Sequence, residues 1–326
     1  MYLDVCVVGA GYVGLVTAAC LADMGHRVTC TDLNTDIIDA IKLGDTPIYE
    51  PGLLEIIKTA QKNNRLKATN DLGHAISGAD VSLICVGTPF VANQIDLSQV
   101  ANAVHSVAKN MYRAKPSHVV IMRSTVIPGT TDDLVIRALQ EAGYNSPTHH
   151  VAMNPEFLRE GTAIDDFMNP STIVIGSKDP RAAEVVKTLY APITKEAILV
   201  TPKEAELIKY ATNAFCSMLI SFSNEIANIC ENVDGLNESI VLGALRKDKR
   251  LSPVSGGSQL EPAILTYLKA GIGYGGSCFP KDTIALADYA RQNSTQAHLL
   301  DAVTKTNLKR PGHVADMLST LTNGLK

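Results

Sequence analysis

The chain has 326 residues, 46% of them hydrophobic and 19% charged, which excludes an intrinsically disordered protein and allows a sizeable buried core. Its 29 lysines and arginines against 33 aspartates and glutamates leave a formal charge of −4, too balanced for a nucleic-acid-binding arm. The chain begins with a strand-like pattern and lacks an uncharged apolar run of the roughly 18 residues that a membrane span needs. We therefore expect a cytoplasmic protein without nucleic-acid or membrane partners, and at about 150 residues per domain the length predicts two domains.

Short strand-like and amphipathic helix-like segments alternate over the first two hundred residues. The strand-like segments are Val5–Val8, Val28–Thr31, Val81–Val86, Val119–Met122, His150–Met153 and Ile173–Ile175. The helix-like segments are Asn34–Leu43, Gly52–Asn63, Leu97–Lys109 and Thr130–Ala142. This alternation predicts an α/β fold, a Rossmann-like doubly wound parallel sheet over residues 1–201, with ligands beyond the carboxyl ends of its strands.

Residues 202–326 are expected to form an all-helical domain. Lys203–Glu231 predicts one long helix, and because its interior carries few charges we expect it to be buried on most sides. A less apolar stripe along it, suited to face a site or another subunit, consists of Glu206, Lys209, Asn213, Ser217, Ser221 and Asn224. Further helices are expected over Leu236–Arg246, Thr283–Arg291 and Ala297–Leu321. Between them, Ser252–Ser258 is expected to be a mobile polar loop.

The segment Gly9-Ala10-Gly11-Tyr12-Val13-Gly14 follows the first strand and opens a helix. Gly9 permits the tight turn, Gly11 lets the backbone approach a pyrophosphate, and Gly14 lets helix and strand pack closely. Asp32, which ends the second strand, is suited to bond a ribose diol and to repel a 2′-phosphate. The pattern predicts dinucleotide binding with NAD favoured over NADP, the alternative being a glycine-rich turn that only packs.

Three further polar groups adjoin predicted strands or lie on the long helix. Hydroxyls in Gly87-Thr88-Pro89 and Ser124-Thr125 are equally suited to cap a strand end or to contact a ligand. Glu156 and Glu160 share a face if their segment is helical, the alternative being a solvated turn. On the long helix, Lys209 needs an anionic or polar partner because an unpaired buried ammonium is costly.

The seven cysteines have neither paired nor metal-ligand spacings, so no disulfide framework and no metal site are expected. Six lie in apolar segments and are expected to be buried: Cys6, Cys20, Cys30, Cys85, Cys216 and Cys230. Cys278 differs because Pro280 suits the first turn of a helix, which puts the sulfur just ahead of a helix N-terminus and beside Lys281. Both features stabilise a thiolate, and Asp282 is within reach to act as a base. A glycine-rich turn with an incidental cysteine is the alternative.

A dinucleotide site together with a thiolate predicts a particular reaction. Oxidising an alcohol needs no sulfur, whereas the resulting aldehyde has no hydride to give until a nucleophile adds to its carbonyl. Addition of cysteine gives a thiohemiacetal, a second hydride transfer leaves a thioester, and water releases the acid. One site then converts a primary alcohol to a carboxylate with two NAD.

These residues closely resemble the UDP-glucose 6-dehydrogenase family, within the nucleotide-sugar dehydrogenases that supply polysaccharide biosynthesis. The matching segments are Gly9–Leu15, Gly87–Pro89, Ser124–Thr131, Asn154–Ala163, Glu206–Phe215 and Gly273–Asp282. The resemblance implies Cys278 as nucleophile, Lys209 at the oxyanion and Glu156 as acid/base for thioester hydrolysis. It further implies that Asp282 and Thr125 hold a water, that Asn213 binds the sugar and that the long helix forms a homodimer.

The resemblance also assigns binding residues. For NAD these are Gly9, Gly11, Tyr12, Val13, Gly14, Asp32, Gly87, Thr88, Pro89, Ser124, Thr125, Glu160 and Lys281. For the nucleotide sugar they are Glu156, Phe157, Leu158, Arg159, Lys209, Asn213, Arg250, Tyr267, Leu268 and Gly273, with Arg250 expected to reach a neighbouring subunit's substrate.

The substrate within this group rests on few positions. Phe279 resembles the UDP-glucose enzymes, whereas the GDP-mannose enzymes usually have Leu there, and Ser277 stands where the N-acetylhexosamine enzymes have His. The chain carries roughly a dozen residues more than the family pattern between Arg250 and Ile264, and it stops at Lys326, where the family continues into a second Rossmann-like domain. We therefore expect NAD binding but poor turnover of UDP-glucose. The alternatives are a two-domain hydroxyacid dehydrogenase with a single hydride transfer, and a cofactor-binding and oligomerisation module without activity.

Overall fold

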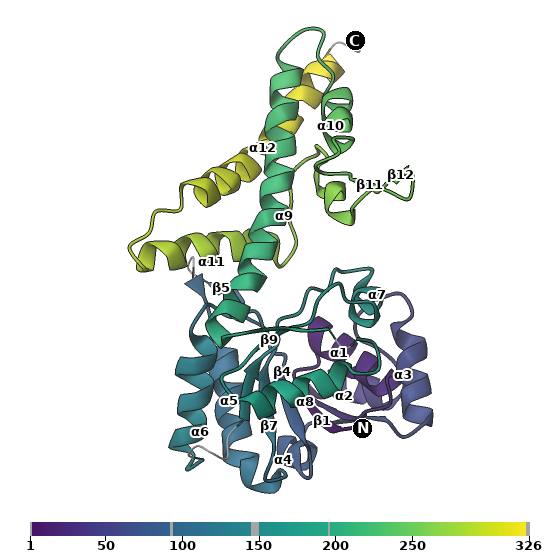
Figure 1. Ribbon diagram of the computed structural model, residues 1–326, viewed down its shortest axis with the longest axis vertical. Helices are drawn as coiled ribbons and strands as arrows, with labels where there is room; N and C mark the ends of the chain where they lie inside the picture. Colours follow the sequence, from purple (N-terminus) through teal and green to yellow (C-terminus); the bar gives the residue numbers. More distant parts are fainter. Residues whose placement is uncertain (1, 92–93, 145–149, 195, 324–326) are drawn as a thin grey trace. The chain divides into compact units, whose positions relative to one another are not determined.

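The computed structural model describes residues 2–91, 94–144, 150–194 and 196–323. Residues 324–326, the last of the printed sequence, lie outside the described residues. The chain divides into two compact units (Figure 1). The first comprises Met1–Val91 and Ile95–Lys209, and the second comprises Ala92–Gln94 and Tyr210–Lys326. The division falls inside the long helix α9 (Pro202–Glu231), eight residues beyond the boundary expected at residue 201.

The first unit is built on an eight-stranded sheet in the order β10-β9-β8-β7-β4-β1-β2-β3. Its strands are β1 (Asp4–Val8), β2 (Arg27–Thr31), β3 (Leu66–Thr69), β4 (Val81–Ile84), β7 (Val119–Met122), β8 (His150–Met153), β9 (Val174–Gly176) and β10 (Ile198–Val200). A separate two-stranded sheet pairs β5 (Phe90–Val91) with β6 (Gln94–Ile95). The Rossmann-like fold class is confirmed, and β3 and β10 are strands that the sequence pattern did not indicate.

The sheet is not wholly parallel, which corrects the expectation for the strand near residues 173–175. β8 and β9 pair antiparallel, with Met153 opposite Gly176, whereas β9 and β10 pair parallel. A buried apolar run is the same in either direction, because both faces of the strand are covered and the side-chain period does not depend on strand polarity.

Helices cover both faces of this sheet (Figure 1). They are α1 (Tyr12–Asp23), α2 (Thr35–Lys42), α3 (Leu53–Lys62), α4 (Leu72–Ile76), α5 (Ser98–Asn110), η1 (Met111–Arg113), η2 (Thr131–Ile136), α6 (Arg137–Glu141), α7 (Ala163–Met168) and α8 (Pro180–Tyr190). Alternate residues of β1 belong to different cores: Val5 and Val7 pack with α1, α3, α7 and α8, and Cys6 and Val8 pack with α4, α5 and α6. A strand buried on both faces explains why its sequence is continuously apolar.

The parallel core of the sheet places the ends of five strands, with the predicted site residues Gly9 and Asp32 among the residues that follow them, at one edge. β2, β1, β4, β7 and β8 pair in parallel, so the residues that follow each strand lie at the same carboxyl-end edge. These residues are Gly9, Asp32, Cys85, Arg123 and Asn154. This edge is where the sequence predicts ligand binding, and that binding stays a prediction.

The second unit is mainly helical. It contains most of α9, followed by α10 (Glu238–Arg246), η3 (Ala263–Tyr267), α11 (Phe279–Gln292) and α12 (His298–Asn323). The expected loop over residues 252–258 is wrong, because β11 (Val254–Ser255) and β12 (Ser258–Gln259) form an antiparallel hairpin there. Gly256 and Gly257 form its turn with φ of +58° and +82°, the backbone conformation that two-residue hairpin turns require.

The less apolar stripe of α9 is buried, and most residues of the helix are buried or half-buried, as expected for a helix covered on most sides. Within the second unit, Asn213 Nδ2 donates to Asp282, Ser217 Oγ accepts from Thr283, and Ser221 Oγ donates to the Val303 carbonyl. These bonds join α9 to α11 and α12 through polar groups. Three large apolar side chains of α9 are about half exposed instead: Phe215, Phe222 and Ile229.

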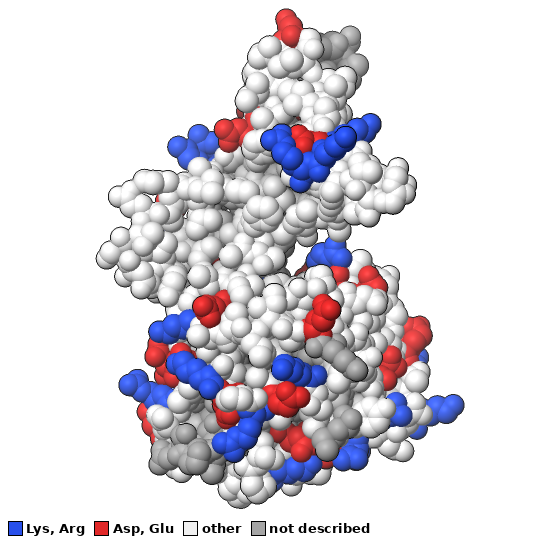
Figure 2. Space-filling view, in the orientation of Figure 1, with Lys and Arg blue, Asp and Glu red and all other residues white. Residues whose placement is uncertain are grey.

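Along the described ranges of the chain, none of the helices combines the length and apolar character needed to span a membrane. Acidic and basic residues are intermixed over the first unit on the face shown in Figure 2. The nearly balanced charge of the sequence is thus reflected in the visible surface of this unit.

Candidate active site

The glycine turn after β1 has the geometry that dinucleotide binding needs. Gly9 has φ of +101°, and a Cβ there would lie 2.8 Å from the Cys85 carbonyl oxygen. A Cβ on Gly14 would lie 1.9 Å from the Gly9 carbonyl oxygen, so only glycine allows α1 to start so close to the turn. Gly11 has no atom within 4 Å of such a position, which leaves its backbone open to a pyrophosphate at the N-terminus of α1. The sequence-predicted roles of all three glycines fit this geometry.

Asp32 holds the same turn from the end of β2. Its Oδ2 accepts from the Ala10 amide at 2.7 Å, and its Oδ1 accepts from the Asn34 amide at 2.9 Å. Each carboxylate oxygen retains a lone pair for a further donor, such as a ribose hydroxyl. The residues present therefore fit an NAD cofactor, with Asp32 carrying the negative charge that disfavours a 2′-phosphate.

Two alanine substitutions separate packing from cofactor approach in this turn. We expect Gly14→Ala to lower the free energy of unfolding by about 3 kcal/mol, because its Cβ meets backbone that cannot move aside. We expect Gly11→Ala to leave the melting temperature unchanged and to weaken NAD binding about tenfold or more, because its methyl group occupies open space needed by the pyrophosphate. Thermal melts and calorimetric NAD titrations of both variants test this. A Gly11→Ala chain with wild-type NAD affinity would contradict the assigned binding turn.

Of the hydroxyls predicted at strand ends, that of Ser124 makes a hydrogen bond within the protein. Ser124 Oγ donates to the Val86 carbonyl at 2.6 Å, so its proton ties β7 to the segment after β4. Thr88 is buried, whereas Gly87 and Pro89 are exposed and Thr125 is half-buried. The predicted cofactor contacts of these residues remain predictions.

Sequence reasoning missed Arg123, which lies beside Ser124 and is 3% exposed. Its guanidinium donates to Asn154 Oδ1 at 2.7 Å and to the Tyr190 hydroxyl at 2.8 Å. It thereby anchors the residue that begins the Asn154–Ala163 segment. An arginine inside a run of strand residues gives a signal in the sequence, because a buried guanidinium requires several acceptors.

Glu156 and Lys209 form a buried ion pair, 7% and 4% exposed, with 3.0 Å between Oε1 and Nζ. Lys209 therefore has the anionic partner that the sequence required, and its ammonium also lies 5.5 Å from the Phe157 ring centroid. Burial raises the pKa of Glu156, but the Lys209 charge, the Leu158 amide and Arg123 together lower it below its ordinary value. Glu156 is thus a carboxylate able to accept a proton.

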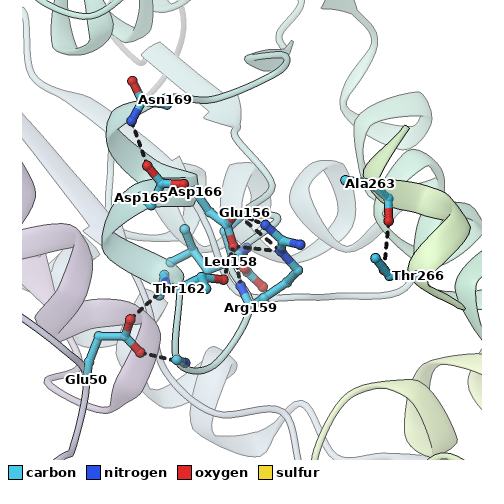
Figure 3. Close-up of polar contacts among 12 residues, drawn as sticks. Glu50, Glu156, Leu158, Arg159, Thr162, Asp165, Asp166, Asn169, Ala263 and Thr266 are labelled. Carbon is cyan, nitrogen blue, oxygen red and sulfur yellow. Dashed lines mark hydrogen bonds and ion pairs between the residues drawn. The ribbon is translucent and has the colours of Figure 1, made fainter. Parts of the chain in front are cut away.

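The segment after β8 is a loop, so the proposed shared helical face of Glu156 and Glu160 is wrong. Glu156 is buried and Glu160 is exposed. Asp166 accepts from the Arg159 amide and guanidinium, and Glu156 Oε2 accepts from the Leu158 amide at 2.7 Å (Figure 3). These local carboxylate–amide bonds replace the helical hydrogen bonds that Pro155 and its neighbours do not make.

Cys278 immediately precedes α11 and is the exposed member of the seven cysteines, whereas the other six are buried as expected. Pro280 occupies the first turn of α11, and the Asp282 amide donates to the Cys278 carbonyl at 2.8 Å. Ser277 Oγ lies 3.5 Å from Cys278 Sγ. Cys278 is therefore an accessible thiol at the N-terminus of a helix.

Asp282 is 1% exposed and lies between two predicted site residues of the second unit. It accepts from Asn213 Nδ2 at 2.6 Å and from the ammonium of Lys281. The carboxylate therefore orients the Asn213 amide, leaving the Asn213 carbonyl oxygen for other donors. Lys281, predicted to bind NAD, is partly buried in this pair.

The predicted substrate-loop residues lie just before Cys278. Tyr267 packs edge-on against Phe279 with ring centroids 5.9 Å apart, and Leu268 is buried. Gly273 has φ of +106°, and a Cβ there would lie 2.6 Å from Asn307 Oδ1. Arg250 is largely exposed and pairs with Asp248, whose pKa it lowers to about 2.

No group of three or more histidine, cysteine, aspartate or glutamate side chains suited to a metal ion occurs among the residues that the structure describes. The first unit provides an open glycine turn and a buried carboxylate–ammonium pair, and the second unit provides an exposed thiol. Fold and glycine turn together define a dinucleotide-binding protein of the Rossmann type.

The chain belongs to the UDP-glucose/GDP-mannose dehydrogenase family, an NAD-dependent family of oxidoreductases acting on CH–OH groups. The family's NAD binding domain matches residues 3–194, and its central domain matches residues 203–309. The chain is 39% identical to the UDP-glucose 6-dehydrogenase TuaD of Bacillus subtilis (strain 168), a match that covers 99% of this chain and 66% of that protein. It thus spans about two thirds of the length of this curated relative.

Solved structures agree with this assignment. A UDP-glucose dehydrogenase from the archaeon Pyrobaculum islandicum superposes with a TM-score of 0.91 at 36% identity, covering 99% of this chain and 72% of that one. A GDP-mannose dehydrogenase from Pseudomonas aeruginosa gives 0.75 at 32% identity, covering 98% and 71%. The family and its NAD cofactor, both expected from the sequence, are therefore confirmed.

Proposed function

We propose that this chain carries the four-electron oxidation of UDP-glucose to UDP-glucuronate with two NAD and one water. The single observation that carries the proposal is the exposed Cys278 thiol at the N-terminus of α11, in a family that oxidises CH–OH groups. A dehydrogenase that stops at an aldehyde or ketone has no need of a nucleophile. A thiol that adds to the aldehyde makes the second hydride transfer possible.

The proposed reaction balances as follows. Oxidation of the primary alcohol releases one hydride and one proton and gives the aldehyde. The Cys278 thiolate then adds to the carbonyl carbon, and the thiohemiacetal loses a second hydride to become a thioester. Water attacks the thioester, breaks the carbon–sulfur bond and returns the thiolate. When NAD is bound, its nicotinamide accepts each hydride.

The family resemblance supplies the remaining proposed roles. Lys209 stabilises the oxyanion of the covalent intermediates, and Glu156 accepts the proton of the attacking water. Their ion pair supports these roles, because the Lys209 charge favours the ionised form of Glu156 before substrate arrives. Asn213 binds the sugar, and Asp282 with Thr125 holds the catalytic water.

UDP-glucose is the proposed substrate because Ser277 and Phe279 stand where the UDP-glucose enzymes have them. The alternative is another nucleotide sugar such as GDP-mannose, since a GDP-mannose dehydrogenase is also similar to this chain. We further propose a homodimer through α9. Phe215, Phe222 and Ile229 are spaced seven residues apart on one face of the helix and are 49%, 44% and 51% exposed.

The stoichiometry of the reaction tests the proposed function. We expect about two NADH for each nucleotide sugar consumed, because the aldehyde is oxidised without leaving the enzyme. NADH is counted by absorbance and the acid by chromatography, at saturating UDP-glucose and in parallel with GDP-mannose. One NADH per sugar would favour a single-hydride dehydrogenase. Calorimetric binding of NAD without any response to UDP-glucose would favour a cofactor-binding module.

A further inference from the structure

Glu50 is a buried carboxylate to which neither the sequence nor the proposed reaction assigns a role. It lies in the connection between α2 and α3, outside every predicted site segment, and is 5% exposed. Its Oε2 accepts from the Gly161 amide at 2.8 Å, and its Oε1 accepts from the Ala163 amide at 2.8 Å (Figure 3). Both of its oxygens therefore hold the end of the 156–163 loop.

Tyr12 connects this carboxylate to the glycine turn. It is the first residue of α1, directly after Gly11, and its hydroxyl donates to Glu50 Oε2. The same hydroxyl oxygen accepts from the Gly161 amide at 3.3 Å. Burial, reinforced by the neighbouring Glu50 charge, raises the pKa of Tyr12 well above its ordinary value, so the phenol keeps the proton it donates. Turn, carboxylate and loop are thereby joined through one shared set of hydrogen bonds.

The loop held in this way begins with Glu156, the partner of Lys209. Its near end is fixed by the Glu156–Leu158 and Asp166–Arg159 bonds described above, and its far end by Glu50. Gly161 has φ of +88° and no atom within 4 Å of a Cβ position, and its amide donates to both Glu50 and the Tyr12 hydroxyl. Losing the acceptor at Glu50 would free the far end of the loop.

We propose that Glu50 is a positioning residue that couples NAD binding at the glycine turn to the order of the 156–163 loop. NAD contacts at the Gly11–Tyr12 backbone restrict the motion of the Tyr12 ring. The Tyr12 hydroxyl in turn fixes the Glu50 carboxylate, which holds the amides of Gly161 and Ala163. Because coupling is reciprocal, a loosened loop weakens NAD binding as much as NAD tightens the loop. The proposal needs only the cofactor of the family and not the identity of the sugar.

Glu206 provides a matched control for a purely structural role. It is fully buried, and its carboxylate accepts from the Gly129 amide at 2.5 Å, from the Thr131 amide at 2.7 Å and from the Thr131 hydroxyl at 2.6 Å. Glu50 and Glu206 thus each hold two backbone amides and one hydroxyl. Only Glu50 links them to the glycine turn. Replacing either by glutamine keeps the shape and removes the acceptor charge.

The test measures NAD affinity by calorimetry and hydrogen exchange of peptides covering Gly161 and Ala163, with and without NAD. In the wild type we expect NAD to slow exchange of these amides. We expect Glu50→Gln to weaken NAD binding about fivefold or more and to abolish that protection, and Tyr12→Phe to act in the same direction. The Tyr12→Phe/Glu50→Gln double variant should bind NAD no more weakly than Glu50→Gln alone, because both changes break one path.

Glu206→Gln should lower the melting temperature to a similar extent while leaving NAD affinity and the NAD-dependent protection intact. Equal losses of NAD affinity in the two glutamine variants would overturn the proposal. So would equal rates of hydrogen exchange at Gly161 and Ala163 in the wild type with and without NAD. If Glu50→Gln does not fold, Tyr12→Phe carries the test alone, and wild-type behaviour of that variant would overturn the coupling. Neither measurement requires turnover, so the coupling can be tested even if the chain does not catalyse the proposed reaction.

Discussion

Replacing Cys278 by serine is expected to reduce formation of the acid by roughly a thousandfold or more, because the substituted hydroxyl is not ionised at neutral pH and cannot form the thioester. The first oxidation needs no sulfur, so a single turnover is expected to give at most one NADH per nucleotide sugar. Rapid-quench analysis of acid and NADH measures both quantities. Acid formation at the wild-type rate would contradict the covalent route.

Ser277→Ala is the companion to this substitution, since it changes the neighbouring exposed side chain and keeps the thiol. Whatever its rate, we expect this variant to form the acid with about two NADH per nucleotide sugar, because the thioester can still form. Labelling with iodoacetamide adds an independent check: burial raises the pKa of Cys6 and Cys85 to about 12, and Cys278 is the exposed thiol, so the native chain should take up one label. The Cys278→Ser variant should take up none.

Removing one member of the Glu156–Lys209 pair is expected to lower the free energy of unfolding by about 3–5 kcal/mol, because the remaining charge is buried without its partner. Lys209→Met and Glu156→Gln test the two members separately by urea denaturation. Lys209→Met should be the more damaging, since it leaves a buried carboxylate, whereas Glu156→Gln leaves an ammonium beside a neutral acceptor.

The double variant Lys209→Met/Glu156→Leu separates stability from catalysis. Replacing both partners by apolar groups of similar size should restore most of the lost stability. Activity should remain lost, because neither the oxyanion partner nor the proton acceptor of the proposed reaction is present. A double variant that regains both stability and turnover would contradict a catalytic role of this pair.

The pH dependence of stability follows from the lowered pKa of Glu156. A carboxylate with a lowered pKa in the folded state contributes stability above its ordinary pKa, and this contribution is lost as the pH falls through the folded-state value. The wild type should therefore lose stability relative to Glu156→Gln as the pH is lowered below about 4.5. Parallel denaturation curves between about pH 7 and pH 3 measure this difference. A constant difference across that range would contradict the ionised pair.

Features that depend on the local backbone could be predicted from the sequence. Position 9 requires glycine because its φ is positive, and both positions 9 and 14 require it because a Cβ would lie less than 3 Å from backbone atoms. Only one residue type meets these requirements, and its spacing along the chain is fixed. Pro280 marks the start of α11 because its ring suits the first helical turn. The polar, glycine-rich surroundings of Cys278 likewise distinguished it from six cysteines in apolar runs.

Partners of polar side chains were decided by the tertiary structure. Lys209 required a partner by its burial, but Glu156 lies on a loop elsewhere in the chain, and the Asn213–Asp282 bond joins residues 69 positions apart. The direction of β9, the inward-facing polar stripe of α9 and the three bonds of Glu50 belong to the same class. Periodicity and residue type report what a segment needs from its surroundings, because those needs are local. Which group meets the need depends on the path of the whole chain, since hydrogen bonds and ion pairs act between atoms that only folding brings together.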